Sequence, residues 1–149
     1  MKFLSVFLRT LDKINPPSKV YAHCDVPCGI YDIAPAKIAA STVAKMVEKI
    51  EALNFEELDK PTRNSFVRMV MTKEQHAELC KRELLILWTD FFKPEHLAMF
   101  PDLHDAFWQA TKLCSKNKQG IDPQVAQELQ DAVAKIGDML MEAKAKAQK

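Results

Sequence analysis

Residues 39–53 read Ala-Ala-Ser-Thr-Val-Ala-Lys-Met-Val-Glu-Lys-Ile-Glu-Ala-Leu, and this stretch carries the pattern that decides the fold. Its apolar side chains recur at intervals of three and four residues, which places them on one face of an α-helix. Just upstream, Asp32 can cap such a helix, and Pro35 suits its first turn, where the missing N–H costs no hydrogen bond. The sequence therefore predicts an amphipathic helix that begins near residue 34.

Three more stripes of the same kind follow this helix. The second begins near Pro61 and continues to about residue 92, where Pro94 ends it because a proline disfavours helix in the preceding residue. The third follows Pro101, and the fourth follows Asp122 and Pro123, a second cap-then-proline start. The links between the stripes are short and favour antiparallel neighbours. We therefore predict an all-α fold, an up-down-up-down four-helix bundle.

Composition narrows the possible functions. The chain has 149 residues, enough for one domain with a core that needs no disulfide or metal to hold it. Only 3 residues are glycine, which argues against glycine-rich phosphate loops and dinucleotide-binding motifs. The formal net charge of +1 gives no basic field for nucleic acid. Because no apolar run approaches 18 residues, we expect no membrane-spanning helix.

The first 22 residues differ from the rest of the chain. They contain four basic side chains and a single acidic one, Asp12, together with a short apolar patch over residues 3–8. This patch is shorter than the apolar run of a secretory signal peptide, and charges follow it closely. Two interpretations of residues 1–22 stay open at this point: a poorly ordered N-terminal tail with an amphipathic turn, or a removable N-terminal leader that precedes a functional domain over residues 23–149. We expect the protein to be cytoplasmic.

Residues 23–31 read His-Cys-Asp-Val-Pro-Cys-Gly-Ile-Tyr and hold two of the four cysteines. Cys80 and Cys114 lie on apolar helical stripes and are expected simply to pack there. Cys24 and Cys28 belong to no stripe, and their spacing allows three alternatives: inert loop thiols, a disulfide or a metal site. The usual structural zinc signatures do not fit, because they need two well-separated ligand pairs.

A cut between Ala22 and His23 would change what this segment offers to a metal. His23 would then supply a free α-amine and an imidazole, Cys24 an amide nitrogen and a thiolate, and Cys28 a second thiolate. Together these form an N₂S₂ set with an axial nitrogen, a donor set that suits nickel(II) or copper(II). Without the cut His23 has no free α-amine to offer. A removable leader and a metal site at residues 23–28 are therefore linked predictions.

Residues 23–31 resemble the nickel hook of nickel superoxide dismutases, H-C-D-x-P-C-G-x-Y. Residues 73–75, residues 87–94 and His96 also resemble that family. The resemblance implies a four-helix bundle with an N-terminal nickel hook and one nickel ion per subunit. It implies disproportionation of superoxide to oxygen and hydrogen peroxide through a Ni(II)/Ni(III) cycle.

The resemblance also assigns roles to individual residues. It implies that His23, Cys24 and Cys28 are the nickel ligands. It implies that Tyr31 stands over the open metal face, where we expect it to gate access and to hydrogen-bond small anions or water. Asp25 matches an acid that holds the hook in place. Packing of Tyr31 on the bundle and a simple turn cap at Asp25 are the structural alternatives.

The resemblance also implies two kinds of partner. Family members are made with a leader that a protease removes, and they assemble as hexamers, so we expect a leader-processing protease and a homohexamer here. Three positions depart from the family pattern: Ala39 and His76 replace a glutamate and an arginine around the axial histidine, and Phe91 replaces a second tyrosine. The main alternative function is a helical-bundle protein that binds or delivers nickel or copper. A thiol redox module and a plain helical interaction protein are further alternatives.

Overall fold

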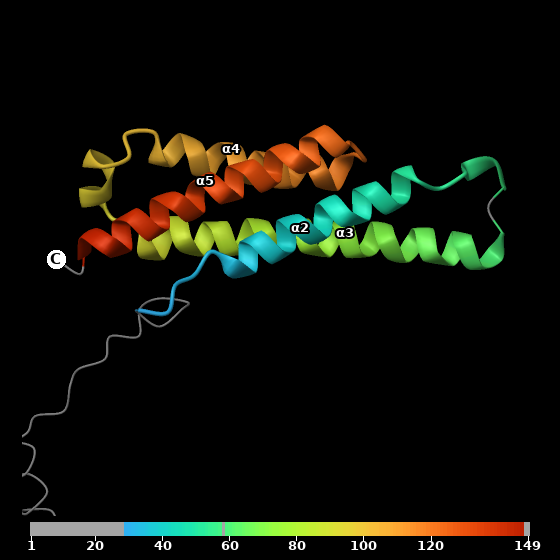
Figure 1. Cartoon of the computed structure of the whole chain (residues 1–149), viewed down its shortest axis with the longest axis horizontal. Coiled ribbons are helices and arrows are strands. Elements are labelled where there is room, and N and C mark those ends of the chain that lie inside the picture. The colour runs from blue at the N-terminus through green and yellow to red at the C-terminus, as the bar shows by residue number, and fades with distance from the viewer. Residues whose placement is uncertain (1–28, 58, 148–149) are drawn as a thin grey trace, which may run out of the picture.

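The computed structural model describes residues 29–57 and 59–147 of the chain (Figure 1). Within these residues the regular structure is helical, and no strand occurs among them. The four α-helices are α2 (Ala34–Glu51), α3 (Lys60–Ile86), α4 (Leu103–Gln119) and α5 (Pro123–Ala147). Three short turns join them: a 3₁₀ turn at Phe55–Glu57, the π-helical turn η2 at Leu87–Phe91 and the 3₁₀ turn η3 at Pro94–Ala98.

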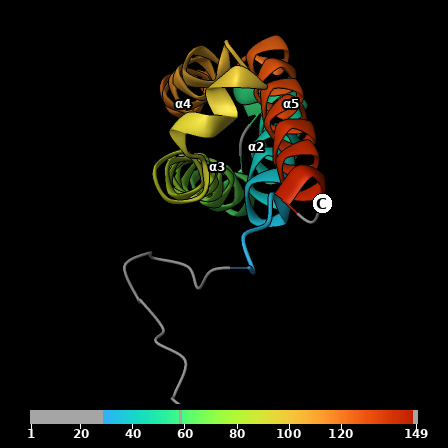
Figure 2. The ribbon, with the colours of Figure 1, turned by 90° about the vertical axis from the view of Figure 1, so that its left-hand side faces the viewer.

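The helices form a ring of four neighbours. α2 packs against α3 and α5, and α4 packs against the same two helices. Successive helices run in opposite directions, and the view along the bundle shows the four of them around a shared interior (Figure 2). The predicted up-down-up-down four-helix bundle is therefore confirmed. No helix among the described residues is both long enough and apolar enough to cross a membrane.

The core follows the apolar stripes of the sequence. Val43, Val47 and Ile50 on α2 are almost fully buried, as their spacing predicts. Cys80 on α3 and Cys114 on α4 are also fully buried, which confirms that they pack in the core. Contact with the Cys114 thiol and burial together raise the pKa of the Cys80 thiol far above its usual range. The Cys80 thiol is therefore held in its neutral form.

Aspartate side chains accept hydrogen bonds from main-chain amides at the start of three helices. Asp59 Oδ1 accepts a hydrogen bond from the amide of Thr62 at 2.8 Å, and hydrogen bonding by the Thr62 side chain and amide lowers the pKa of the Asp59 carboxyl. Asp122 Oδ1 accepts one from the amide of Gln124 at 2.8 Å, so its predicted capping role is confirmed. Asp32 accepts from the first helical amide, that of Ala34, at 2.7 Å. These bonds satisfy amides that have no partner within the helix.

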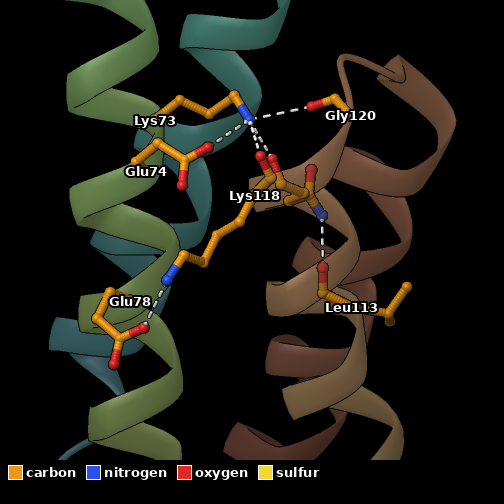
Figure 3. Close-up of polar contacts among 7 residues, drawn as sticks. Lys73, Glu74, Glu78, Leu113, Lys118 and Gly120 are labelled. Carbon is orange, nitrogen blue, oxygen red and sulfur yellow. Dashed lines mark hydrogen bonds and ion pairs between the residues drawn. The ribbon is translucent and has the colours of Figure 1, made fainter.

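A buried lysine joins the middle of α3 to the end of α4 (Figure 3). Lys73 is 2% exposed, and its ammonium donates to the main-chain carbonyl oxygens of Asn117, of Lys118 at 3.1 Å and of Gly120 at 3.0 Å. Glu74 lies 3.3 Å from the same ammonium. The last carbonyls of a helix lack partners within it and carry partial negative charge, so a buried cation is a good match for them.

The segment between α3 and α4 closes one end of the bundle. The last turn before Phe92 is π-helical, and Pro94 then opens η3, so the predicted end of the second helix before Pro94 is confirmed. α4 begins at Leu103, two residues after Pro101. In Figure 1 this segment lies at the same end of the molecule as the start of α2 and the end of α5. That end is where residues 29–33 enter the bundle.

Candidate metal centre

The predicted nickel ligands His23, Cys24 and Cys28 lie outside the described residues, as do Asp25 and the predicted leader, residues 1–22. Among the residues that the structure does describe, no group of three or more His, Cys, Asp or Glu side chains is placed to hold a metal ion. The described chain begins at Gly29, directly after Cys28. The structure therefore describes how the chain leaves the predicted hook.

Gly29 has a backbone conformation that favours glycine. Its φ angle is +96°, in the region that side chains with a Cβ rarely adopt, and no other described residue has a positive φ. A Cβ at this position would meet no atom within 4 Å, so backbone conformation and not crowding is what requires glycine. Gly29 thus fixes the backbone conformation at the point where the described chain begins.

Tyr31, two residues after Gly29, is buried against the core. Its side chain is 5% exposed, whereas that of the preceding residue, Ile30, is 66% exposed. The Tyr31 ring meets the ring of Phe91 in η2 edge to face, with centroids 5.6 Å apart and planes at 62°. This geometry is favoured between aromatic rings. Phe91, expected from the family pattern to lie near the site, is therefore beside Tyr31.

The main chain of Tyr31 is held from the opposite side by α5. The Lys144 ammonium, in the last turns of α5, donates to the carbonyl oxygen of Tyr31. Nearby, Gly137 of α5 allows a close approach, because a Cβ there would lie 3.3 Å from the Ile33 side chain and 3.2 Å from Lys37 Cε. Tyr31 thus contacts both α5 and η2, and Ile33 and Lys37 lie close to α5.

An aromatic cluster supports the Tyr31 ring. The ring of Phe91 stacks on His96 at 5.8 Å and meets Phe92 at 5.1 Å, and Phe92 in turn meets Phe107 of α4 at 5.4 Å. The imidazole of His96 is oriented by its Nδ1, which accepts a hydrogen bond from the amide of Lys93 at 2.9 Å. Phe92 is buried in this cluster. It is therefore a core residue.

The other two departures from the family pattern are also described. Ala39 is fully buried on α2 and offers no polar group. His76 on α3 is half-buried, and its Nδ1 lies 3.0 Å from the carbonyl oxygen of Thr72 one turn earlier. This contact occupies one ring nitrogen within the helix and leaves Nε2 as the atom that can reach outward.

A family model described as nickel-containing superoxide dismutase matches residues 18–144 of the chain. The chain belongs to the nickel-containing superoxide dismutase family. Nickel is its cofactor, and nickel-dependent dismutation of superoxide is its activity.

Two relatives in this family are bacterial. The superoxide dismutase [Ni] of Streptomyces seoulensis is 40% identical over 132 residues, which covers 87% of this chain and 93% of the relative. The superoxide dismutase [Ni] of Streptomyces coelicolor is 38% identical over 129 residues, with the same two coverages.

Solved structures of the family resemble this bundle closely. A Ni-containing superoxide dismutase with nickel ligation in the oxidised state is 39% identical, covers 83% of this chain and 99% of its own, and superposes with a TM-score of 0.72. A native nickel superoxide dismutase is 37% identical with a TM-score of 0.71, covering 82% of this chain and 99% of its own. The family fold is thus present over nearly the whole length of these enzymes.

Sequence reasoning missed the contribution of α5 to the site. Sequence patterns assign neither Lys144 nor Gly137 a contact with the residues that follow Cys28. The hydrogen bond from Lys144 spans 113 residues of sequence, so no local pattern could reveal it. Only the packing of α2 against α5 brings the two segments together.

Proposed function

We propose that this protein carries out nickel-dependent superoxide dismutation at a hook formed by residues 23–28. His23 would supply its α-amine and imidazole, Cys24 its amide nitrogen and thiolate, and Cys28 a second thiolate. The observation that carries the proposal is this donor set within six residues of chain, in a family whose described cofactor is nickel. Imidazole and amine nitrogens with thiolate sulfurs are ligands that suit a late first-row metal.

The chain's own residues have three tasks in this reaction. Bound nickel supplies the one-electron redox chemistry by which superoxide is oxidised to oxygen and reduced to peroxide. Anionic thiolates and a deprotonated amide place negative charge at the metal site, which favours the higher oxidation state. Tyr31 would limit access to the open face and hydrogen-bond small anions or water there. Asp25 would hold the hook in its turn.

Removal of residues 1–22 would be the step that makes the site. The α-amine of His23 exists only after a protease has cut before it, because in the uncut chain this nitrogen belongs to a peptide bond. A peptide nitrogen carries no basic lone pair and is a much poorer ligand until deprotonated. The uncut protein is therefore expected to fold but to lack activity.

Assembly as a homohexamer is also proposed. An isolated hook would be open to water and to competing ligands, so a neighbouring subunit would help to cover it. Exposed apolar side chains are available for such contacts: Ile38 on α2 is 65% exposed, and Val67 and Met71 on α3 are each 54% exposed. We place the hexamer in the cytoplasm, because the apolar patch of the leader is too short for an export signal.

The proposed ligands are tested by Cys24→Ser and Cys28→Ser in protein processed to His23. Each variant should lose nickel and superoxide dismutation while its helical circular dichroism stays close to that of the unchanged protein. Cys114→Ala is the matched control, because it removes a cysteine that is buried in the core. It should retain nickel and activity. Activity that survives both hook substitutions would overturn the proposal.

A further inference from the structure

The side chain of Lys144 on α5 is hydrogen-bonded to the segment that follows the proposed hook. Its ammonium donates to the carbonyl oxygen of Tyr31, which lies three residues after Cys28 in the sequence. The two partners come from opposite ends of the described chain and are both at least partly shielded from water. A hydrogen bond from a charged donor in such a setting is stronger than one between neutral groups.

The contact is well placed to fix the orientation of a whole peptide unit. Because a peptide group is planar, holding the carbonyl oxygen of Tyr31 also holds the amide of Asp32. The Tyr31 ring is held independently against Phe91. Between this fixed point and Cys28 lie only Gly29 and Ile30, so the direction in which the chain reaches the hook depends on the same peptide unit.

We propose that Lys144 is a positioning residue for the nickel centre, because its bond to the Tyr31 carbonyl anchors the chain that carries the hook. This inference rests on the proposed placement of nickel at residues 23–28. Lys144 itself touches neither metal nor substrate in this account. It acts through the main chain of Tyr31, in the way that residues outside the ligand shell orient metal ligands in other proteins.

A simpler role for Lys144 is a favourable interaction with the C-terminal end of the α5 dipole. Lys146 shares that role, because it also lies in the last turn of α5. Lys146 is exposed, whereas it is Lys144 that donates to the Tyr31 carbonyl oxygen. The pair therefore separates the anchoring role, which belongs to Lys144, from the dipole effect, which belongs to both.

The test compares Lys144→Met, Lys146→Met and the unchanged protein, each processed to His23. Nickel affinity is measured by competition with a chelator, and hydrogen exchange of the amides of residues 29–33 is measured in metal-free protein. Lys144→Met should weaken nickel retention about tenfold, within the range found when outer-shell partners of metal ligands are removed. It should also speed exchange over residues 29–33. Lys146→Met should change neither nickel retention nor hydrogen exchange. Lys144→Arg, which keeps a charged donor, should leave both close to those of the unchanged protein.

The readouts keep two failures apart. If the unchanged protein binds no nickel, the proposed function fails, whereas hydrogen exchange in metal-free protein still reports whether Lys144 anchors residues 29–33. Helical circular dichroism of each variant shows that the bundle is intact. Equal nickel retention and equal exchange in Lys144→Met and Lys146→Met would overturn the inference.

Discussion

Two lysines of this bundle donate to main-chain carbonyl oxygens, and they act in different regions. Lys73 is buried in the bundle and joins α3 to the last residues of α4 through three carbonyls (Figure 3). Lys144 lies at the end where residues 29–33 enter the bundle, and it donates to the carbonyl oxygen of Tyr31. We call Lys73 and its three acceptor residues, Asn117, Lys118 and Gly120, the Lys73 region. We call Lys144 and residues 29–33 the Lys144 region.

A hydrogen bond from a lysine to a main-chain carbonyl can thus serve stability in one place and the geometry of a site in another. The Lys73 region closes a link between two helices, so its loss should be felt by the whole bundle. Lys144 holds a short segment that precedes the first described helix. Loss of its bond should therefore affect mainly the proposed nickel hook and much less the stability of the bundle. The predictions below test this division.

The largest effect is expected from Lys73→Met. The substitution removes a buried ammonium and leaves buried carbonyl oxygens without a donor, which should lower the free energy of unfolding by about 3 kcal/mol. Urea denaturation of metal-free protein measures this. Lys81→Met is a suitable control, because Lys81 makes one hydrogen bond, to Ser115 Oγ at 3.1 Å. A Lys73→Met protein as stable as this control would contradict the division.

Gly29→Ala should act chiefly on the nickel site. A φ of +96° is strained for alanine, by about 1–3 kcal/mol, and the strain falls on the residue after Cys28. Gly120→Ala in the Lys73 region is the matched control. The φ of Gly120 is −135°, and a Cβ there would lie 3.7 Å from the carbonyl oxygen of Lys116, an ordinary contact.

Nickel retention and urea denaturation, measured on both glycine variants, check this prediction. Gly29→Ala should weaken nickel retention, whereas Gly120→Ala should leave both quantities nearly unchanged. If Gly29→Ala kept its nickel as tightly as Gly120→Ala, the backbone at Gly29 would not be part of the site's geometry.

A smaller effect is expected at the start of α5. Asp122→Ala removes the acceptor of the Gln124 amide and should lower the free energy of unfolding by about 1 kcal/mol. Nickel retention should not change, because this cap lies at the other end of α5 from Lys144. Loss of nickel in a variant that denatures normally would show that the two ends are coupled.

The smallest effect concerns an exposed ion pair beside the Lys73 region. Lys118 Nζ lies 3.0 Å from Glu78 Oε2, and the hydrogen bond from Lys118 together with its positive charge lowers the pKa of the Glu78 carboxyl. Because the folded pKa is the lower one, the pair stabilises the fold above the unfolded pKa of glutamate and loses that effect as pH falls through the folded value. Lys118→Met should raise the Glu78 pKa in an NMR titration and barely change stability. An unshifted pKa would contradict the assignment.

Much of the fold could be predicted from sequence because its signals are local. Helical stripes, Asp122 as a cap and Pro94 as a stop each depend on residues within a few positions of one another, and the structure agrees with all three. The Lys73 link could not be predicted in this way. A lone lysine on a stripe does not indicate its partners, which lie 44 to 47 residues further along the chain.

The site divides along the same line. The donor types and spacing of His23, Cys24 and Cys28 are local, so sequence alone supplies the prediction of a metal set. The fixing of Tyr31 by Phe91 and Lys144 depends on the packing of three helices at one end of the bundle and is visible only in the structure. The proposed ligands thus lie within six residues of one another in the sequence, whereas the residues that contact Tyr31 come from distant parts of the chain.

The most direct test of the account is the metal content of protein whose N-terminus has been established as His23. After loading with nickel and removal of the excess, mass spectrometry under native conditions should find about one nickel per chain, and the uncut protein treated in the same way should retain none. Equal nickel in the cut and uncut proteins, or none in either, would contradict the central claim that the exposed amine of His23 completes the site.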